Sequence, residues 1–179
     1  MTSFDLSQDF FSYFDLARSY TIERNLLEQR YLDRSRQFHP DRVMHLSEHD
    51  KRIAMERSSA INKAYQTLRD PLKRAEYLLL LEGIDLNSSE PKSGAPVPNQ
   101  AFLLAMLELR EELEQAQKTG LTAVEALRES VQVQAVEHMD QAILALEAGS
   151  IAQAAQALVA HRYLTRFLAE VDHLDTANE

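Results

Sequence analysis

The breaks in this chain constrain its fold most, because the segments between them have the length and periodicity of helices. Each of the four glycines, Gly83, Gly94, Gly120 and Gly149, falls between two stretches with helical periodicity. The five prolines also lie at or beside such breaks. Between the breaks there are few β-branched runs and almost no alternation of apolar with polar residues. The sequence therefore predicts an all-α protein.

The same periodicity predicts two groups of helices. The first group, of four, is expected at about 9–16, 21–38, 50–68 and 71–83, and the second, of three, at about 99–118, 122–148 and 151–174. Thr21, Thr122 and Ser150 are the expected caps of three of these helices. Glycines at positions 120 and 149 permit tight connections, so the last three helices are expected to form an antiparallel bundle.

The stretch from 84 to 98 separates the two groups. It holds three prolines, three serines and Gly94, which is a composition typical of a linker. We therefore expect an N-terminal domain at 1–83, a short linker at 84–98, a three-helix domain at 99–175 and a tail at 176–179.

Cysteine usage and apolar patterning exclude several classes of protein. The chain has no cysteine, which rules out disulfides, a cysteine nucleophile and metal ligation by its own thiolates. No apolar run approaches the length of a membrane span. The first residues show neither a secretory signal nor an arginine-rich transit pattern. We expect a cytoplasmic protein that does not bind membranes.

The net charge of −9 lies entirely in the second half of the sequence. Residues 1–83 carry 13 basic and 13 acidic side chains, whereas residues 84–179 carry 6 basic and 15 acidic ones. Nucleic-acid binding needs clustered cations, so the acidic half argues against a nucleic-acid partner. The uneven charge also indicates two modules with different partners.

The tripeptide His39-Pro40-Asp41 is the most informative local motif. Proline biases the residue before it away from helical dihedrals, so the helix that precedes the motif is expected to end near Phe38. The tripeptide would then form an exposed corner that carries an imidazole and a carboxylate on a stiff proline. The simpler alternative is a helix stop made of ordinary turn residues.

The sequence around this corner resembles a J-domain, the module by which DnaJ-type co-chaperones engage a DnaK-class chaperone ATPase. Arg36-Gln37-Phe38 leads into the motif, Arg42 follows it, and the next helix carries the stretch INKAYQTL at 61–68. Two further stretches, RDPLKRAEYLL at 69–79 and AFLLAMLELREEL at 101–113, resemble the HscB family of iron–sulfur co-chaperones.

This resemblance implies a binding protein with no catalytic residues and no enzymatic activity. HscB-like proteins bring an IscU-type scaffold, which carries a nascent iron–sulfur cluster, to a dedicated HscA-type chaperone and stimulate its ATPase. The resemblance therefore implies no cofactor on this chain, because the cluster belongs to the scaffold. It also implies a four-helix J-domain at the N-terminus, and we expect a monomer.

The chaperone-binding residues are expected on and beside the corner. They are His39, Pro40, Asp41, Arg30, Arg36 and Arg42. General J-domains often carry a Lys-Arg pair in the second helix, whereas this chain has Leu32 and Asp33 at the aligned positions. That departure favours a dedicated chaperone partner over a general one.

The scaffold-binding residues are expected on the helix at 99–118. Phe102, Met106, Leu109 and Leu113 form a single apolar stripe suited to a bundle core. Three leucines are left over from this stripe and lie beside two glutamates, which is a pattern typical of a binding patch. The resemblance implies that the scaffold docks on this patch and that an aromatic residue of the last helix belongs to the same surface. The expected scaffold-binding residues are Leu103, Leu104, Leu107, Glu108, Glu111 and Tyr163. The family pattern has methionine where this chain has Leu104. Alternatively, these leucines pack against the J-domain or another helix.

Other readings of the sequence have less support. His45 and His49 have a spacing that can share a metal ion, but no HExxH pattern accompanies them, so no metal site is expected. A hydrolase that uses His39 and Asp41 lacks a serine in a nucleophile motif. The serious alternative is a general J-domain co-chaperone whose acidic bundle holds other clients.

Overall fold

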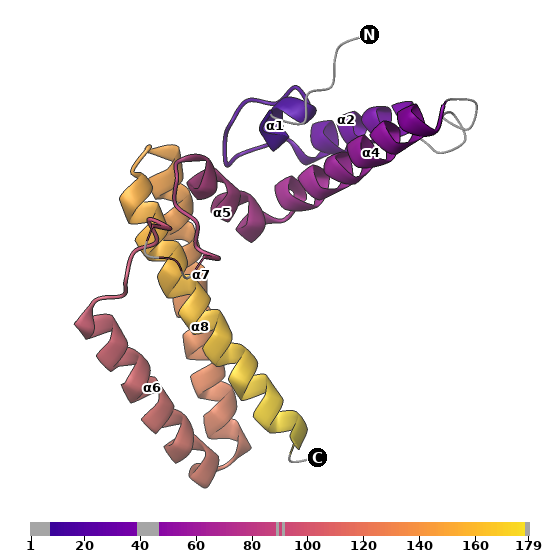
Figure 1. Cartoon of the computed structure of the whole chain (residues 1–179). Helices are drawn as coiled ribbons and strands as arrows, with labels where there is room; N and C mark the ends of the chain where they lie inside the picture. Colours follow the sequence, from indigo (N-terminus) through magenta and orange to yellow (C-terminus); the bar gives the residue numbers. More distant parts are fainter. Residues whose placement is uncertain (1–7, 39–46, 89, 91, 178–179) are drawn as a thin grey trace. The chain divides into compact units, whose positions relative to one another are not determined.

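The computed structural model describes residues 8–38, 47–88, 90 and 92–177. Over these residues the chain consists of α-helices and irregular segments, without a strand, which confirms the all-α prediction (Figure 1). The chain divides into two compact units, Met1–Leu78 and Leu79–Glu179. This division falls a few residues before the segment 84–98, in which the sequence places the domain boundary.

The first unit contains α1 (Phe10–Tyr13), α2 (Arg24–Gln37), α4 (Glu48–Arg69) and most of α5 (Pro71–Leu81). Helices α1 and α2 are shorter than the sequence predicts. The main-chain N–H groups of residues 14 and 15 bond back to the last turn of α1, and Asp15 then takes a left-handed φ of 51°. Aspartate tolerates that conformation better than most residues, and it ends the helix there.

The predicted cap at Thr21 is wrong, because the structure places Glu23 at the N-cap of α2. Its side chain makes no capping hydrogen bond. Aspartate, asparagine and serine cap three of the other helices: Asp9 accepts from Ser12 N, Asn99 from Phe102 N and Ser47 from Asp50 N.

The core of the first unit is small and rich in aromatic contacts. Its fully buried large side chains are Phe11, Phe14, Leu27, Ile61 and Leu68. Stacked rings extend this core: Tyr31 of α2 lies on Tyr65 of α4 at 3.9 Å, and Phe10 of α1 lies on Tyr77 of α5 at 4.3 Å. Each pair joins two helices of the unit.

Arg34 interrupts the apolar face of α2, and the structure shows why an arginine stands there. Its Nε donates to the main-chain oxygen of Tyr13 at 3.1 Å, and its Nη2 donates to the Asp15 carboxylate at 2.9 Å. Arg34 therefore satisfies a carbonyl at the end of α1 and holds the left-handed residue after it, so it fastens α1 to α2.

The second unit is built on α6 (Gln100–Thr119), α7 (Leu121–Glu147) and α8 (Ile151–Ala177). Successive helices run in opposite directions, as the sequence predicts, and α7 and α8 lie side by side (Figure 1). The predicted cap at Thr122 is wrong, because Gly120 occupies the N-cap position of α7. Helix α8 continues three residues beyond the predicted end, so the first two residues of the expected tail are helical.

All three helices contribute to the core of this bundle. Its buried members are Leu113, Val124, Val131, Ala135, Leu164, Phe167, Leu168 and Val171. Small residues continue the buried seam toward the α7–α8 turn, where Ala142 and Ala154 are fully buried. His161 Nδ1 lies 2.8 Å from the main-chain oxygen of Ala135, so this nitrogen carries the proton and bonds α8 directly to the backbone of α7.

The described part of the linker is fastened to the second unit. Asp85 N donates to the main-chain oxygen of Ser93 at 2.7 Å and closes a loop. From α8, the Arg162 guanidinium donates to the main-chain oxygen of Leu86 and to Asn87 Oδ1. These contacts give the linker a fixed path along the bundle that its composition alone does not predict.

Candidate functional site

The motif expected to bind a chaperone, His39-Pro40-Asp41 with Arg42, lies outside the described residues. The structure describes the two helices that flank it. Helix α2 ends at Gln37, with Phe38 at the C-cap position, and α4 begins at Glu48. The helix stop just before His39 is the one that the proline predicts, while the role of the motif stays a prediction.

Arg30 and Arg36, the other two residues expected to bind a chaperone, lie on α2 and are exposed. Arg30 pairs with Asp15 and Arg36 pairs with Asp33, each at 3.4 Å. Exposed ion pairs at such distances contribute little to stability, so a partner can recruit either guanidinium at small cost. The structure places both residues on one helix and shows no closer association between them.

The leucines expected to bind a scaffold are exposed on α6. Leu103, Leu104 and Leu107 keep 42%, 52% and 55% of their surface accessible. On a neighbouring stripe of the helix, Leu113 is buried in the bundle core, and Met106 and Leu109 pack against that core. Helix α6 therefore satisfies the core with one stripe and leaves three leucines over, as its composition predicts.

The structure brings three of the six expected scaffold-binding residues into one groove. Leu103 and Leu107 of α6 and Tyr163 of α8 line a groove of about 420 Å³ between the two helices. Tyr163 packs edge-on against Phe102, with the ring centroids 5.7 Å apart, and this contact fixes the aromatic wall.

The other three expected residues lie outside this groove. Leu104, Glu108 and Glu111 are exposed on α6 and do not line it. Successive helical residues are about 100° apart, so Leu104 points away from the direction that Leu103 takes. The expected surface is thus a groove beside an outer face that carries one leucine and two carboxylates.

Sequence reasoning missed three charged residues of the groove: Arg110, Arg166 and Glu170. A signal for them was present in the spacing. Arg110 lies three residues after Leu107 and seven after Leu103. On the last helix, Arg166 lies three residues after Tyr163, and Glu170 lies seven after it. Residues spaced so lie on one helical face, so the two faces could have been extended past their apolar members.

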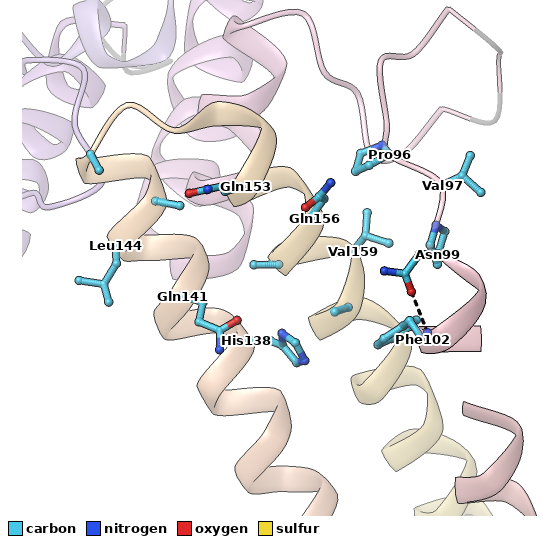
Figure 2. Close-up of a pocket in the computed structure, with 15 residues that line it drawn as sticks. Pro96, Val97, Asn99, Phe102, His138, Gln141, Leu144, Gln153, Gln156 and Val159 are labelled. Carbon is cyan, nitrogen blue, oxygen red and sulfur yellow. Dashed lines mark hydrogen bonds between the residues drawn. The ribbon is translucent and has the colours of Figure 1, made fainter. Parts of the chain in front are cut away.

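A larger pocket, of about 640 Å³, contains none of the expected site residues. It lies between the segment 96–99 with Phe102 and the facing sides of α7 and α8 (Figure 2). His138 Nδ1 is buried there and has no hydrogen-bond partner within the part of the chain that the structure describes. The pocket adjoins the proposed docking groove through Phe102, whose ring packs against Tyr163.

The described residues show no group of three or more histidine, cysteine or carboxylate side chains placed to hold a metal ion. His49 Nδ1 lies 3.4 Å from Arg52 Nη2 in the first turns of α4, whereas His45 is outside the described residues. Among the helices that the structure describes, none has the length and hydropathy needed to cross a membrane.

Comparison with known proteins gives two family matches that follow the two parts of the chain. Residues 9–77 match the DnaJ domain, and residues 98–172 match the HSCB C-terminal oligomerisation domain. A relative from Aromatoleum aromaticum, described as a co-chaperone protein HscB homolog, is 40% identical over 120 residues. That region is 66% of this chain and 64% of the relative, so the match spans less than two thirds of its length.

Solved structures of two co-chaperones have the same fold. Chaperone HscB from Vibrio cholerae aligns with a TM-score of 0.74 and 29% identity, over 95% of this chain and 99% of that one. The human co-chaperone protein HscB aligns with a TM-score of 0.77 and 27% identity, over 96% of this chain and 84% of that one.

These matches define the class first: this is a J-domain protein that carries a second, helical domain at its C-terminal end. The second domain distinguishes one family within that class. Over both domains, and in the same order, the chain is similar to the HscB co-chaperones.

Proposed function

We propose that this protein is a co-chaperone of iron–sulfur cluster biogenesis that delivers an IscU-type scaffold to an HscA-type chaperone and stimulates its ATPase. The similarity of both domains to HscB co-chaperones supports this role. The observation that carries the proposal is the set of three exposed leucines on α6, two of which line a groove with Tyr163. A chain with a J-domain and a separate apolar docking face is equipped to hold a client while it engages the chaperone.

The chaperone side acts by placing charge at a corner. Asp41 is the group we expect to meet a cation of the ATPase, and His39 is expected to hydrogen-bond beside it. Stimulation requires that these residues bind one conformation of the chaperone better than the other, because equal binding to both shifts nothing. Arg30 and Arg36 add positive charge on the neighbouring helix face, which favours an acidic partner surface.

The client side acts by burying apolar surface. Leu103, Leu104 and Leu107 together expose a patch that the core of this unit does not use. A few side chains buried at the centre of an interface carry most of its binding energy. Glu108 and Glu111 lie beside the patch on the same helix, so we expect the scaffold to carry basic groups where it covers them.

We further propose that the protein is a cytoplasmic monomer without enzymatic activity or a cofactor of its own. One chain carries both surfaces, so neither function requires a second copy. Light scattering after gel filtration tests this directly: a mass near 20.4 kDa is expected. A mass of twice that value at micromolar concentration would contradict the monomer.

Steady-state ATP hydrolysis by the HscA-type chaperone, measured as this protein is titrated with and without the scaffold, tests the proposed function. Stimulation that is larger with the scaffold present supports delivery of this client. Equal stimulation in both titrations would favour a general J-domain co-chaperone with other clients. Absence of stimulation would contradict both.

A further inference from the structure

The groove between α6 and α8 combines an apolar floor with charged edges, which carry two arginines and Glu170. Met106 and Phe167 pack in the bundle core beneath it, and Leu103 and Leu107 form part of its wall. Arg110 stands on the α6 side and Arg166 on the α8 side. Two guanidinium groups thus stand beside the apolar floor of this groove.

The two arginines differ in what they contact. Arg110 Nη2 lies 3.9 Å from Glu170 Oε2, in a pair whose side chains are 63% and 51% exposed. Arg166 is exposed, and within the described residues it has no hydrogen bond or ion pair. It is one of only six basic residues in the acidic stretch 84–179, where carboxylates are abundant. Among the described residues, the groove thus holds one guanidinium in a long, exposed ion pair and one guanidinium without an ion pair.

We propose that the groove is a subsite for an acidic residue of the client, whose carboxylate binds Arg166 while a neighbouring apolar side chain fills the floor beside Leu103, Leu107 and Tyr163. This inference rests on the proposed function and adds the kind of client segment that the surface accepts. A guanidinium binds a carboxylate through two parallel hydrogen bonds, and cover by an apolar client strengthens that pair by excluding water.

The charges on α6 and α8 determine which charges the client segment should carry where it covers each helix. Glu108 and Glu111 are exposed on the outer face of the helix, away from the groove. A client segment that crosses α6 therefore meets carboxylates on one side and Arg166 on the other. The fitting client surface is basic where it covers the outer face and acidic where it reaches α8, with apolar side chains between.

The test is calorimetric binding of an IscU-type scaffold to the full chain and to Arg166 variants. We expect Arg166→Glu to raise Kd by about tenfold or more and Arg166→Gln to raise it less. Lys118→Glu is the matched control, because it makes the same change in net charge at an exposed position of α6 outside the groove. The control is expected to stay within about twofold of wild type.

A charge reversal on the scaffold identifies the partner of Arg166. Single Asp→Lys and Glu→Lys variants of the scaffold are measured against Arg166→Glu, and restored binding at one position is the expected result. A Kd for Arg166→Glu within twofold of wild type, or no larger an effect than Lys118→Glu gives, would overturn the subsite and leave the proposed function intact. Weakening that no scaffold change relieves would also overturn it. No scaffold binding by the wild-type chain would overturn the proposed function together with the subsite.

Discussion

The two units of this protein hold their helices together by different means. The first has a small core and adds stacked aromatic pairs and arginine contacts, as with Tyr31 on Tyr65 and Arg34 on the end of α1. The second packs long helices through small residues such as Ala142 and Ala154, with apolar side chains in the core below them. Arginine contacts and stacked rings thus stabilise the first unit, which is expected to bind the chaperone. Close packing of helices stabilises the second unit, which exposes the leucines of α6.

The two expected binding surfaces also have different structural origins. In the first unit the expected chaperone-binding motif lies in the segment between α2 and α4, outside the described residues. In the second unit the expected scaffold-binding site is the side of a helix. Helix α6 packs one apolar stripe into the core and leaves Leu103, Leu104 and Leu107 exposed. The two surfaces should therefore fail independently.

The largest expected effect follows from removal of the corner imidazole. We expect His39→Gln to reduce ATPase stimulation to the basal rate, because the change in the chaperone's equilibrium depends on this contact. Scaffold binding by the same variant, measured by calorimetry, should stay within about twofold of wild type. Loss of both activities would show that the two surfaces are not separate.

The converse change removes the docking face. Alanine at Leu103, Leu107 and Glu108 together should weaken scaffold binding by about 100-fold or more, since two anchors of the groove are truncated. Stimulation without scaffold should persist, and circular dichroism should show an intact fold, because all three residues are exposed. Retained scaffold binding would place the client elsewhere on the chain.

A larger side chain at the buried alanines between α7 and α8 should destabilise the second unit. Ala142 is fully buried, so we expect Ala142→Leu to lower the free energy of unfolding by about 1–3 kcal/mol. Ala126→Leu is the control on the same helix, at an exposed position, and should change stability by less than about 0.5 kcal/mol. Urea denaturation of both variants decides this, and equal effects would contradict tight packing at Ala142.

The smallest expected effect is a pH dependence in the first unit. Burial raises the pKa of Asp9, but hydrogen bonds from Ser12 and Arg18 and the charge of Arg18 outweigh it, so the pKa lies below the ordinary value. The folded state then favours the carboxylate. Its contribution is present above the unfolded pKa of about 4 and is lost as the pH falls below that value.

Asp9→Asn tests this contribution and keeps a side chain that can cap α1. We expect the variant to be less stable than wild type by about 1 kcal/mol or less at pH 7, with a smaller difference near pH 3. Urea denaturation at the two pH values measures it. A difference that does not shrink on acidification would show that charge on Asp9 is not what stabilises the unit.

The sequence predicts the order and type of the helices well, because glycine, proline and apolar periodicity are local signals. It fails where tertiary contacts decide, as at Arg34, which interrupts the apolar face of α2 because it bonds the end of α1 and the Asp15 carboxylate. The exposed leucines of α6 were predictable from their excess over one core stripe. Their division between groove and outer face was not, because it depends on where α8 lies beside α6.

Delivery as proposed requires one chain to hold the client and engage the chaperone at once. The most direct test mixes two full-length variants, His39→Gln and the Leu103/Leu107/Glu108 triple alanine variant, and measures scaffold-dependent stimulation of the HscA-type ATPase. Each variant keeps one intact surface, so delivery that requires both surfaces on one chain predicts no recovery in the mixture. Recovery of the wild-type response would contradict delivery by a single chain.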